Sequence, residues 1–383
     1  MRRRLVILTE IISPYRIPLF NALVQHPEVD LHVIFLAETD PALRQWQVYK
    51  DEIRFSYQIL PSWRKRLGKY NLLLNRGIAD ALDKSAPDVI LCGGYNYAAS
   101  WRSLLWARHR GIPFYLWSES NAQDLRRGHD VVEFLKGQFL CRCSGFVVPG
   151  NAAREYLRTD KNVSENLIFT APNAVDNELF AAATDSARQS AAARRQEMVL
   201  PSRYFLFAGR LVREKGVFEL LSAYAKLDES MRQQVGLVFV GDGVSRRQLE
   251  EQAASISPGV IQFAGFAQRE QLAIYYALAE MLVLPTYADT WGLVVNEAMA
   301  CGLPVILSRA AGCATELVRE HWNGLLVQPR DVSSLALAMQ TLAVQRDLCA
   351  SMGANSAQHI SHYSPKEWSH GISQITAKVG AND

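Results

Sequence analysis

Residues 281–302, MLVLPTYADTWGLVVNEAMACG, combine a short apolar run, a loop and a small-residue run that favours a helix. Residues 281–284 are apolar without alternation, which is typical of a strand buried on both faces of a parallel sheet. Asp289 or Thr290 could cap the following helix, and Gly302 could end it. This order predicts an α/β fold, with ligands bound beyond the carboxyl ends of the strands.

Short apolar runs of the same kind recur along the whole chain and alternate with longer mixed segments. Such alternation predicts parallel strands joined by crossover helices. The chain has 383 residues, more than one hydrophobic core usually organises, so two domains are expected. The expected strands are residues 5–8, 31–36, 88–92, 114–117 and 145–148 in the first half, and residues 204–208, 236–240, 260–263, 281–284 and 305–307 in the second.

The change of domain is expected within residues 172–198. Residues 181–197 are rich in Ala, Arg, Ser and Gln and carry no strand pattern, which fits either a linker or an exposed helix. We therefore expect domains at residues 1–180 and 181–362, followed by a C-terminal helix in residues 363–383. Two facing domains of this kind would form a cleft between them.

The composition excludes several classes of protein. Apolar residues make up 49% and charged residues 21% of the chain, which fits a globular protein with packed cores. The net charge of +3 is too small to indicate nucleic-acid binding. The N-terminal apolar run is broken by Glu10 and Pro14, so it predicts a first strand instead of a signal peptide. A cytoplasmic protein with reduced thiols is expected, with contact to a membrane surface left open.

The loop after residues 281–284 carries the first sign of chemistry. Backbone N–H groups of Trp291, Gly292 and Leu293 would lie at a helix N-terminus, which suits a diphosphate. Asp289 and Glu297 bracket this point, and each carboxylate could accept hydrogen bonds from one ring of a nucleotide sugar. The alternative is that Asp289 only caps the helix and that Glu297 is a solvated helix residue.

A second segment supplies positive charge. Residues 205–216, FLFAGRLVREKG, run from an expected strand into a loop that contains Arg210 and Lys215. These cations could neutralise a diphosphate from the opposite side, Arg210 as a rigid fork and Lys215 as a point charge. The alternative is a surface salt-bridge patch with Glu214.

A series of short motifs then follows in order through the second half of the chain. They are residues 172–176 (PNAVD), 209–211 (GRL) with 215–216 (KG), 240–243 (VGDG), 263–265 (FAG), 292–293 (GL) with 297–304 (EAMACGLP), 315–316 (TE) and 323–327 (NGLLV). In this order they resemble glycosyltransferase family 4, a group of retaining enzymes with the GT-B architecture of two facing Rossmann-like domains. The resemblance implies a nucleotide-sugar donor in the C-terminal domain, an acceptor in the N-terminal domain, and a last helix that crosses back to the N-terminal domain.

The resemblance also implies individual roles. Arg210 and Lys215 would hold the diphosphate and stabilise the departing nucleotide, so they are the expected catalytic residues together with Asp289, which would bind the transferred sugar. Glu297 would bind the ribose hydroxyls, and main chain near Ala267 would face the nucleobase. No metal or other cofactor is implied. The expected donor-binding residues are Gly209, Arg210, Lys215, Gly241, Ala267, Asp289, Trp291, Gly292, Leu293 and Glu297.

The chain departs from the family pattern in two respects. Asp289 stands where the family usually has glutamate, which shortens its reach by one methylene. The loops at residues 11–16 and 92–97 contain no histidine. Front-face attack, in which the departing phosphate takes the acceptor proton, does not require one. Family frequency makes a uridine donor the first expectation.

The N-terminal half carries the candidates for the acceptor side, and they lie at expected strand ends. The acceptor would be a saccharide, a lipid-linked or a small-molecule hydroxyl, as in the biosynthesis of polysaccharides or glycoconjugates. For Glu119, a structural hydrogen bond fits as well as a role in the cleft. The candidates are Tyr15, Arg16, Tyr95, Asn96 and Glu119.

Residues 63–70, WRKRLGKY, mix cations with aromatic and aliphatic side chains. This composition fits peripheral contact with an anionic inner membrane surface, a basic acceptor loop or plain solvated surface. Two other functions also stay open for the whole chain. One is a non-catalytic subunit that binds a nucleotide sugar for a separate transferase, and the other is a GT-B epimerase.

Overall fold

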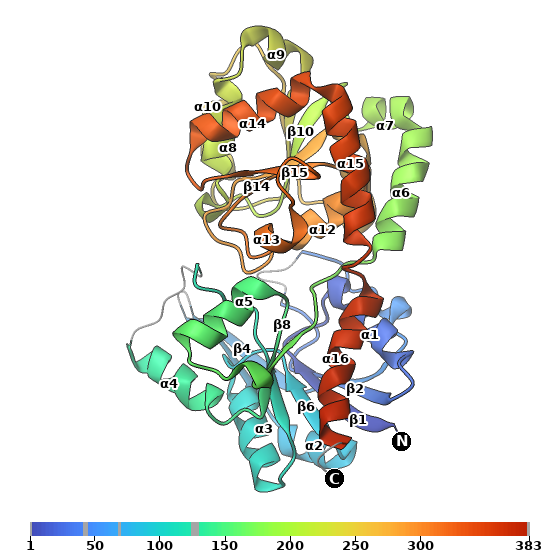
Figure 1. Cartoon of the computed structure of the whole chain (residues 1–383), viewed down its shortest axis with the longest axis vertical. Coiled ribbons are helices and arrows are strands. Elements are labelled where there is room, and N and C mark those ends of the chain that lie inside the picture. Colours follow the sequence, from blue (N-terminus) through green and yellow to red (C-terminus); the bar gives the residue numbers. More distant parts are fainter. Residues whose placement is uncertain (1, 41–44, 68–69, 124–129, 381–383) are drawn as a thin grey trace. The chain divides into compact units, whose positions relative to one another are not determined.

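The computed structural model describes residues 2–40, 45–67, 70–123 and 130–380. They form two compact units, Met1–Val175 with Pro365–Asp383, and Asp176–Ser364. Each unit is built on a parallel β-sheet covered by helices (Figure 1). Within the part of the chain so described, no helix is long and apolar enough to cross a membrane.

The sheet of the first unit has seven strands, and every neighbouring pair is parallel. Its order is β3 (Ser56–Ile59), β2 (Val29–Phe35), β1 (Arg3–Thr9), β6 (Val89–Cys92), β7 (Phe114–Trp117), β8 (Gly145–Val148) and β9 (Ile168–Thr170). Along β1, Leu5 and Ile7 enter one core while Val6 and Leu8 enter the other. Burial on both faces explains why the strand is apolar without alternation.

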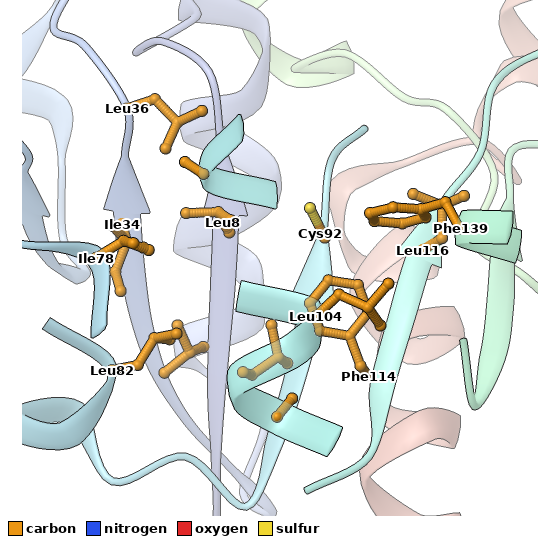
Figure 2. Packing of buried hydrophobic residues seen from close by; sticks show 14 of the residues in the cluster. Leu8, Ile34, Leu36, Ile78, Leu82, Cys92, Leu104, Phe114, Leu116 and Phe139 are labelled. Atoms are coloured by element: carbon orange, nitrogen blue, oxygen red, sulfur yellow. The ribbon is translucent and has the colours of Figure 1, made fainter. Parts of the chain in front are cut away.

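Helices cover the two cores of this sheet. On one face α1 (Ile17–Val24) packs against α16 (Pro365–Gly380), where Trp368 is completely buried 5.8 Å from the Phe20 ring and 5.3 Å from the Trp117 ring. Figure 2 shows part of the core on the other face. The remaining helical elements are η1 (Pro14–Arg16), η2 (Lys50–Glu52), α2 (Ile78–Ser85), α3 (Ala98–His109), α4 (Asp130–Leu140), α5 (Asn151–Glu155), η3 (Tyr156–Asp160) and η4 (Glu165–Leu167).

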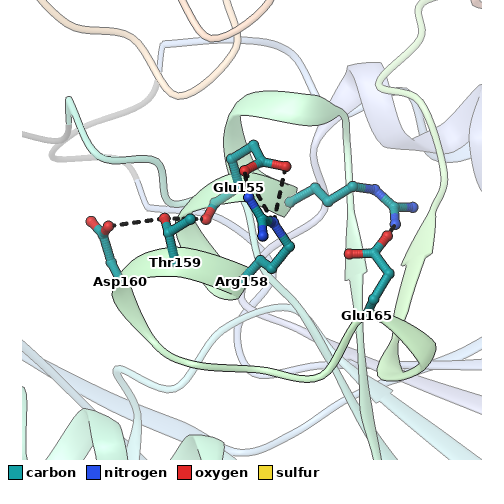
Figure 3. A network of polar contacts seen from close by, with 6 residues as sticks. Glu155, Arg158, Thr159, Asp160 and Glu165 are labelled. Carbon is teal, nitrogen blue, oxygen red and sulfur yellow. Dashed lines mark hydrogen bonds and ion pairs between the residues drawn. The ribbon is translucent and has the colours of Figure 1, made fainter.

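Helix α5 continues directly into η3, a π-helical turn whose polar contacts are shown in Figure 3. Glu155 and Arg158 form an ion pair at 2.6 Å, and the Thr159 hydroxyl donates to the backbone carbonyl of Glu155 at 2.6 Å. These side chains are exposed, so water competes for the same bonds and the ion pair contributes little to stability.

A separate antiparallel hairpin, β4 (Ser62–Leu67) and β5 (Tyr70–Asn75), lies between β3 and α2 in the chain. The sequence did not predict it, because β4 reads SWRKRL and has no apolar run. The edge strands β3 and β9 were also missed. An edge strand has one neighbour and is less buried, so it lacks the continuous apolar pattern of a central strand.

The sheet of the second unit has six parallel strands. Its order is β12 (Ile261–Gly265), β11 (Gly236–Val240), β10 (Tyr204–Ala208), β13 (Met281–Leu284), β14 (Val305–Ser308) and β15 (Gly324–Val327). The predicted bounds of β10, β11 and β13 are confirmed to the residue. Strand β15, at the sheet edge, was not predicted.

The helices of the second unit begin earlier than expected. Residues 181–197 are not a linker, because α6 (Asn177–Gln189) packs against α11 and buries Phe180 and Thr184. The Asp176 side chain caps α6 by accepting from the Leu179 N–H at 3.0 Å. The unit therefore starts at residue 176 and not at 181. The other helices are α7 (Ala191–Glu197), η5 (Arg213–Lys215), α8 (Val217–Ala225), α9 (Glu229–Gln234), α10 (Arg246–Ala253), α11 (Arg269–Leu278), α12 (Leu293–Ala300), α13 (Ala314–Leu317), α14 (Val332–Val344) and α15 (Arg346–Ile360).

Candidate functional site

Loops at the carboxyl ends of β10 and β11 contact each other through their main chains. The Gly209 N–H donates to the Val240 carbonyl at 2.9 Å, and the Gly241 N–H donates to the Gly265 carbonyl at 2.7 Å. A Cβ on Gly241, whose φ is +132°, would lie 1.9 Å from the Gly209 carbonyl oxygen. Only glycine allows this approach, which leaves peptide groups bare of side chains at the strand ends.

The loop after β10 is also held against the loop after β13. A Cβ on Gly216, whose φ is +68°, would lie 2.0 Å from the Pro285 carbonyl oxygen. The Glu214 carbonyl accepts from the Tyr287 N–H at 2.8 Å and from the Thr286 hydroxyl at 3.0 Å. These contacts fix the position of Lys215 relative to the residues that follow β13.

Lys215 and Asp289, which lie 74 residues apart in the sequence, form an ion pair at this point. Their side chains are only 17% and 16% exposed. The sequence had assigned them to different parts of the donor, and the fold brings their charged groups into direct contact. Arg210 belongs to the same loop as Lys215 but is exposed to solvent.

Asp289 does not cap the helix, contrary to the prediction. Helix α12 starts at Leu293 after Gly292, whose φ is +103°. The Asp289 carboxylate instead accepts from the Trp291 N–H at 3.4 Å, so that N–H is not free for an anion. The Asp289 carbonyl accepts from the Gly312 N–H at 3.0 Å, which ties this loop to the one after β14.

Glu297 is not a solvated helix residue. It lies on α12, and its carboxylate accepts from the hydroxyl of Tyr276 on α11 at 2.8 Å. Burial raises the pKa of Glu297 to about 7, and the hydrogen bond from Tyr276 lowers it only in part. Burial, and secondarily the nearby Glu297 charge, raises the pKa of Tyr276, which keeps its hydroxyl protonated as a donor.

Sequence reasoning missed Tyr276, because it lies in an ordinary amphipathic helix pattern with no signal that marks it as a partner of Glu297. Next to Glu297, Asn296 accepts from the Trp291 indole N–H at 2.8 Å and holds that buried ring in place. Ala267 is half-buried in the loop between β12 and α11. Its main chain carries no contact that identifies a ligand.

Three of the acceptor-side candidates gather in the first unit. Arg16 donates to the Thr9 hydroxyl at 2.6 Å, lies 3.9 Å from the Glu119 carboxylate and stacks 4.5 Å from the Trp117 ring centre. Tyr15 lies beside it, with the Arg16 guanidinium 5.9 Å from its ring centre. These contacts satisfy Arg16 within the unit, which favours a partly structural role for it.

Tyr95 belongs to a different group of side chains. The ammonium of Lys136, a buried residue on α4, lies 5.5 Å from the Tyr95 ring centre and donates to the Tyr156 hydroxyl at 2.7 Å. Sequence reasoning missed Lys136, because a single lysine in an amphipathic helix is usually solvated. Asn96, next to Tyr95, is exposed.

Two helix-covered parallel sheets place the chain among the Rossmann-like α/β proteins. Residues 190–359 match the family described as Glycosyl transferases group 1, and residues 19–179 match the one described as Glycosyltransferase Family 4. Together the two matches show that the chain belongs to the group 1 glycosyltransferases, also described as glycosyltransferase family 4.

Individual relatives match over part of the chain. A D-inositol 3-phosphate glycosyltransferase of Corynebacterium jeikeium is 32% identical over 206 residues, which cover 51% of this chain and 48% of that protein. The putative teichuronic acid biosynthesis glycosyltransferase TuaC of Bacillus subtilis is 34% identical over 38% of this chain and 34% of its own length. The chain thus spans about half or less of the curated relatives it matches.

Solved structures match over nearly the whole chain. Anabaena Alr3699/HepE, solved in complex with UDP and glucose, has a TM-score of 0.76 at 18% identity and covers 98% of this chain and 100% of its own. A glycosyltransferase from Rickettsia africae ESF-5 has a TM-score of 0.78 at 14% identity, with both chains fully covered. The predicted GT-B fold with two Rossmann-like units is therefore confirmed.

Proposed function

We propose that this chain is a retaining glycosyltransferase that moves a sugar from a nucleotide-diphosphate donor, with UDP-sugars first, to an acceptor hydroxyl. The acceptor would belong to a saccharide, a lipid-linked or a small molecule. The Lys215–Asp289 ion pair between the loops after β10 and β13 is the observation that carries the proposal. It joins a cation suited to the diphosphate to a carboxylate suited to the sugar.

The charges of this group support an anionic donor. Lys215 and Asp289 neutralise each other, so the exposed Arg210 leaves a net positive charge in the loops. A diphosphate would bind to Arg210 and share the Lys215 ammonium, freeing the Asp289 carboxylate to accept hydrogen bonds from sugar hydroxyls. As the bond to the sugar breaks, both cations would stabilise the growing charge on the leaving phosphate.

The other donor residues would set the position of the nucleotide. Glu297, once ionised, would accept hydrogen bonds from the ribose hydroxyls, with Tyr276 holding the carboxylate in place. The side-chain-free peptides at Gly209 and Gly241 would let the donor approach the strand ends, and main chain at Ala267 would face the base. Backbone N–H groups of Gly292 and Leu293, at the start of α12, would contact the phosphate.

The names of relatives and the ligands of structural neighbours support a uridine donor and a hydroxyl acceptor. Alr3699/HepE was solved with UDP and with UDP-glucose. The Corynebacterium relative is named for transfer to D-inositol 3-phosphate, a polyol. Since no histidine stands in the loops at residues 11–16 and 92–97, we propose front-face displacement, in which the leaving phosphate takes the acceptor proton.

The acceptor would bind to the first unit, with Tyr15, Arg16 and Glu119 in one group and Tyr95 and Asn96 in another. The pairing of Lys215 with Asp289 also keeps a second function open. If this ion pair never opens, the Asp289 carboxylate is not freed for the sugar, and the chain would be a non-catalytic subunit that binds a nucleotide sugar. Formation of a glycosylated product separates these two functions. An unchanged donor mass would instead indicate an epimerase.

The test uses the purified full chain. A panel of nucleotide sugars is screened by thermal shift, since a ligand that binds only the native state raises the melting temperature. Release of nucleotide diphosphate and product mass are then measured with candidate acceptors.

Arg210→Ala and Lys215→Ala should each lower turnover about 100- to 1,000-fold, as for other groups that stabilise transition-state charge. Arg213 is an exposed cation of the same loop, and Arg213→Ala should leave turnover unchanged. Undiminished turnover in both site variants would refute the proposal.

A further inference from the structure

The β4–β5 hairpin exposes an apolar face. Trp63, Leu72 and Leu74 are 53%, 40% and 42% exposed. The strand register pairs Trp63 with Leu74 and Lys65 with Leu72, so these side chains share one face of the hairpin. Large apolar side chains grouped on one small surface differ from the single exposed ones that are normal in proteins.

The opposite face of the hairpin is polar and turned toward the protein. Arg64, between Trp63 and Lys65, forms ion pairs with Glu10 at 3.2 Å and with Asp40, which is only 3% exposed. Its cross-strand partner Leu73 is 2% exposed. A one-residue shift in register would bury the apolar face and expose Arg64, but these ion pairs hold the observed register.

The charge of the segment narrows the choice of partner. Residues 62–76 contain five Lys or Arg residues and no Asp or Glu. Arg64 is neutralised from inside the unit, whereas Lys65 is exposed. A second copy of the chain would bring two cationic hairpins together, and like charges repel. A surface with negative charge on the outside and an apolar layer beneath it would match both the cations and the exposed apolar side chains of the hairpin.

We propose that the β4–β5 hairpin docks this protein on an anionic lipid bilayer, with Trp63, Leu72 and Leu74 inserted among the headgroups and Lys65 beside the lipid phosphates. Tryptophan suits this position, because its ring is apolar and its indole N–H can reach a polar group. Docking would hold the first unit, where we place the acceptor, at the surface where lipid-linked acceptors lie. It does not depend on the proposed transfer reaction.

The test is co-sedimentation of the full chain with vesicles of phosphatidylcholine, with and without phosphatidylglycerol. Binding is expected to the mixed vesicles, to fall as salt is raised, and to be at least about tenfold weaker with phosphatidylcholine alone. Lys65→Glu should weaken binding about tenfold or more, because each charge near an anionic surface contributes about fivefold. Trp63→Ser with Leu74→Ser should weaken it about tenfold.

Two controls keep the test specific. Leu337→Ser removes a side chain of α14 that is 65% exposed in the second unit, and binding should be unchanged. Thermal unfolding, compared with that of the wild type, checks that the hairpin variants are folded. The proposal is overturned by equal binding to both kinds of vesicle or by hairpin variants that bind like the wild type. It is also overturned if Phe134→Ser on α4, 64% exposed, abolishes binding while the hairpin variants do not, or if Trp63 proves to mediate a dimer in light scattering.

Discussion

Glu297→Gln should stabilise the protein at alkaline pH while weakening its donor site. The carboxylate is buried on α12, and burial raises its pKa from the ordinary 4.5 to about 7. Glutamine has the same shape and its amide oxygen can still accept from Tyr276. The substitution therefore removes the ionisation and keeps the packing.

The direction of the effect follows from the two pKa values. Between pH 4.5 and 7 the unfolded chain releases the Glu297 proton while the folded chain retains it, so the free energy of unfolding falls as pH rises. Above about pH 7 both states are ionised and the loss is constant. At about 1.4 kcal/mol per pKa unit, the loss at pH 8 approaches an upper bound of about 3.5 kcal/mol.

Thermal unfolding of the wild type and the variant at pH 5 and pH 8 measures this difference. For a unit of this size, the gain at pH 8 corresponds to a rise in melting temperature of at most roughly 7 to 14 °C, with a much smaller rise at pH 5. Glu251 on α10 has a side chain that is 62% exposed, so Glu251→Gln is the control and should raise the melting temperature at neither pH. Equal melting temperatures of wild type and variant at pH 8, or an equal gain at both pH values, would refute the reasoning.

Glu297→Gln, which should stabilise the fold at alkaline pH, should weaken UDP binding there. UDP affinity of the wild type should increase as pH rises through about 7, because an ionised Glu297 would accept the hydrogen bonds proposed from ribose better than the protonated acid. In Glu297→Gln this pH dependence should disappear, as measured by calorimetry. A pH profile that is identical in the two proteins would show that Glu297 does not contact the nucleotide.

Two further predictions concern stability. Gly241→Ala should destabilise the second unit by about 2–4 kcal/mol and weaken UDP binding, because its Cβ would lie 1.9 Å from the Gly209 carbonyl oxygen. Thermal unfolding measures this loss, and Gly137→Ala on α4, where a Cβ meets nothing within 4 Å, is the matched control. Trp368→Ala should cost about 3–5 kcal/mol by denaturant unfolding, since the ring is completely buried against Phe20, and a cost below about 1 kcal/mol would contradict the packing described for α16.

The central strands could be predicted because their pattern is local. Strands β10, β11 and β13 are buried on both faces, and their apolar runs begin and end where the strands do. The β4–β5 hairpin could not be predicted for the opposite reason. Arg64 faces the protein while Trp63, Leu72 and Leu74 are exposed, so the polarity of these residues does not follow their burial.

The sequence proposed candidate donor residues, but it did not predict the contacts that they make. Lys215 and Asp289 form an ion pair, although they were expected to bind different parts of the donor. Asp289 or Thr290 was expected to cap the helix, yet α12 begins at Leu293, after Gly292 with its positive φ. Tyr276 was missed, because nothing in its own segment marks it as the partner of Glu297.

The sequence by itself determined the parallel α/β architecture, the family and the loops that carry charge. These depend on the order of residues within a strand, a turn or a helix end, where each residue interacts with its near neighbours. Only the tertiary structure decided that Lys215 pairs with Asp289, that Glu297 has a pKa of about 7 and that Trp63 faces outward. Ion pairing, desolvation and exposure depend on atoms that distant segments bring within a few ångströms, and residue spacing along the chain does not contain that distance.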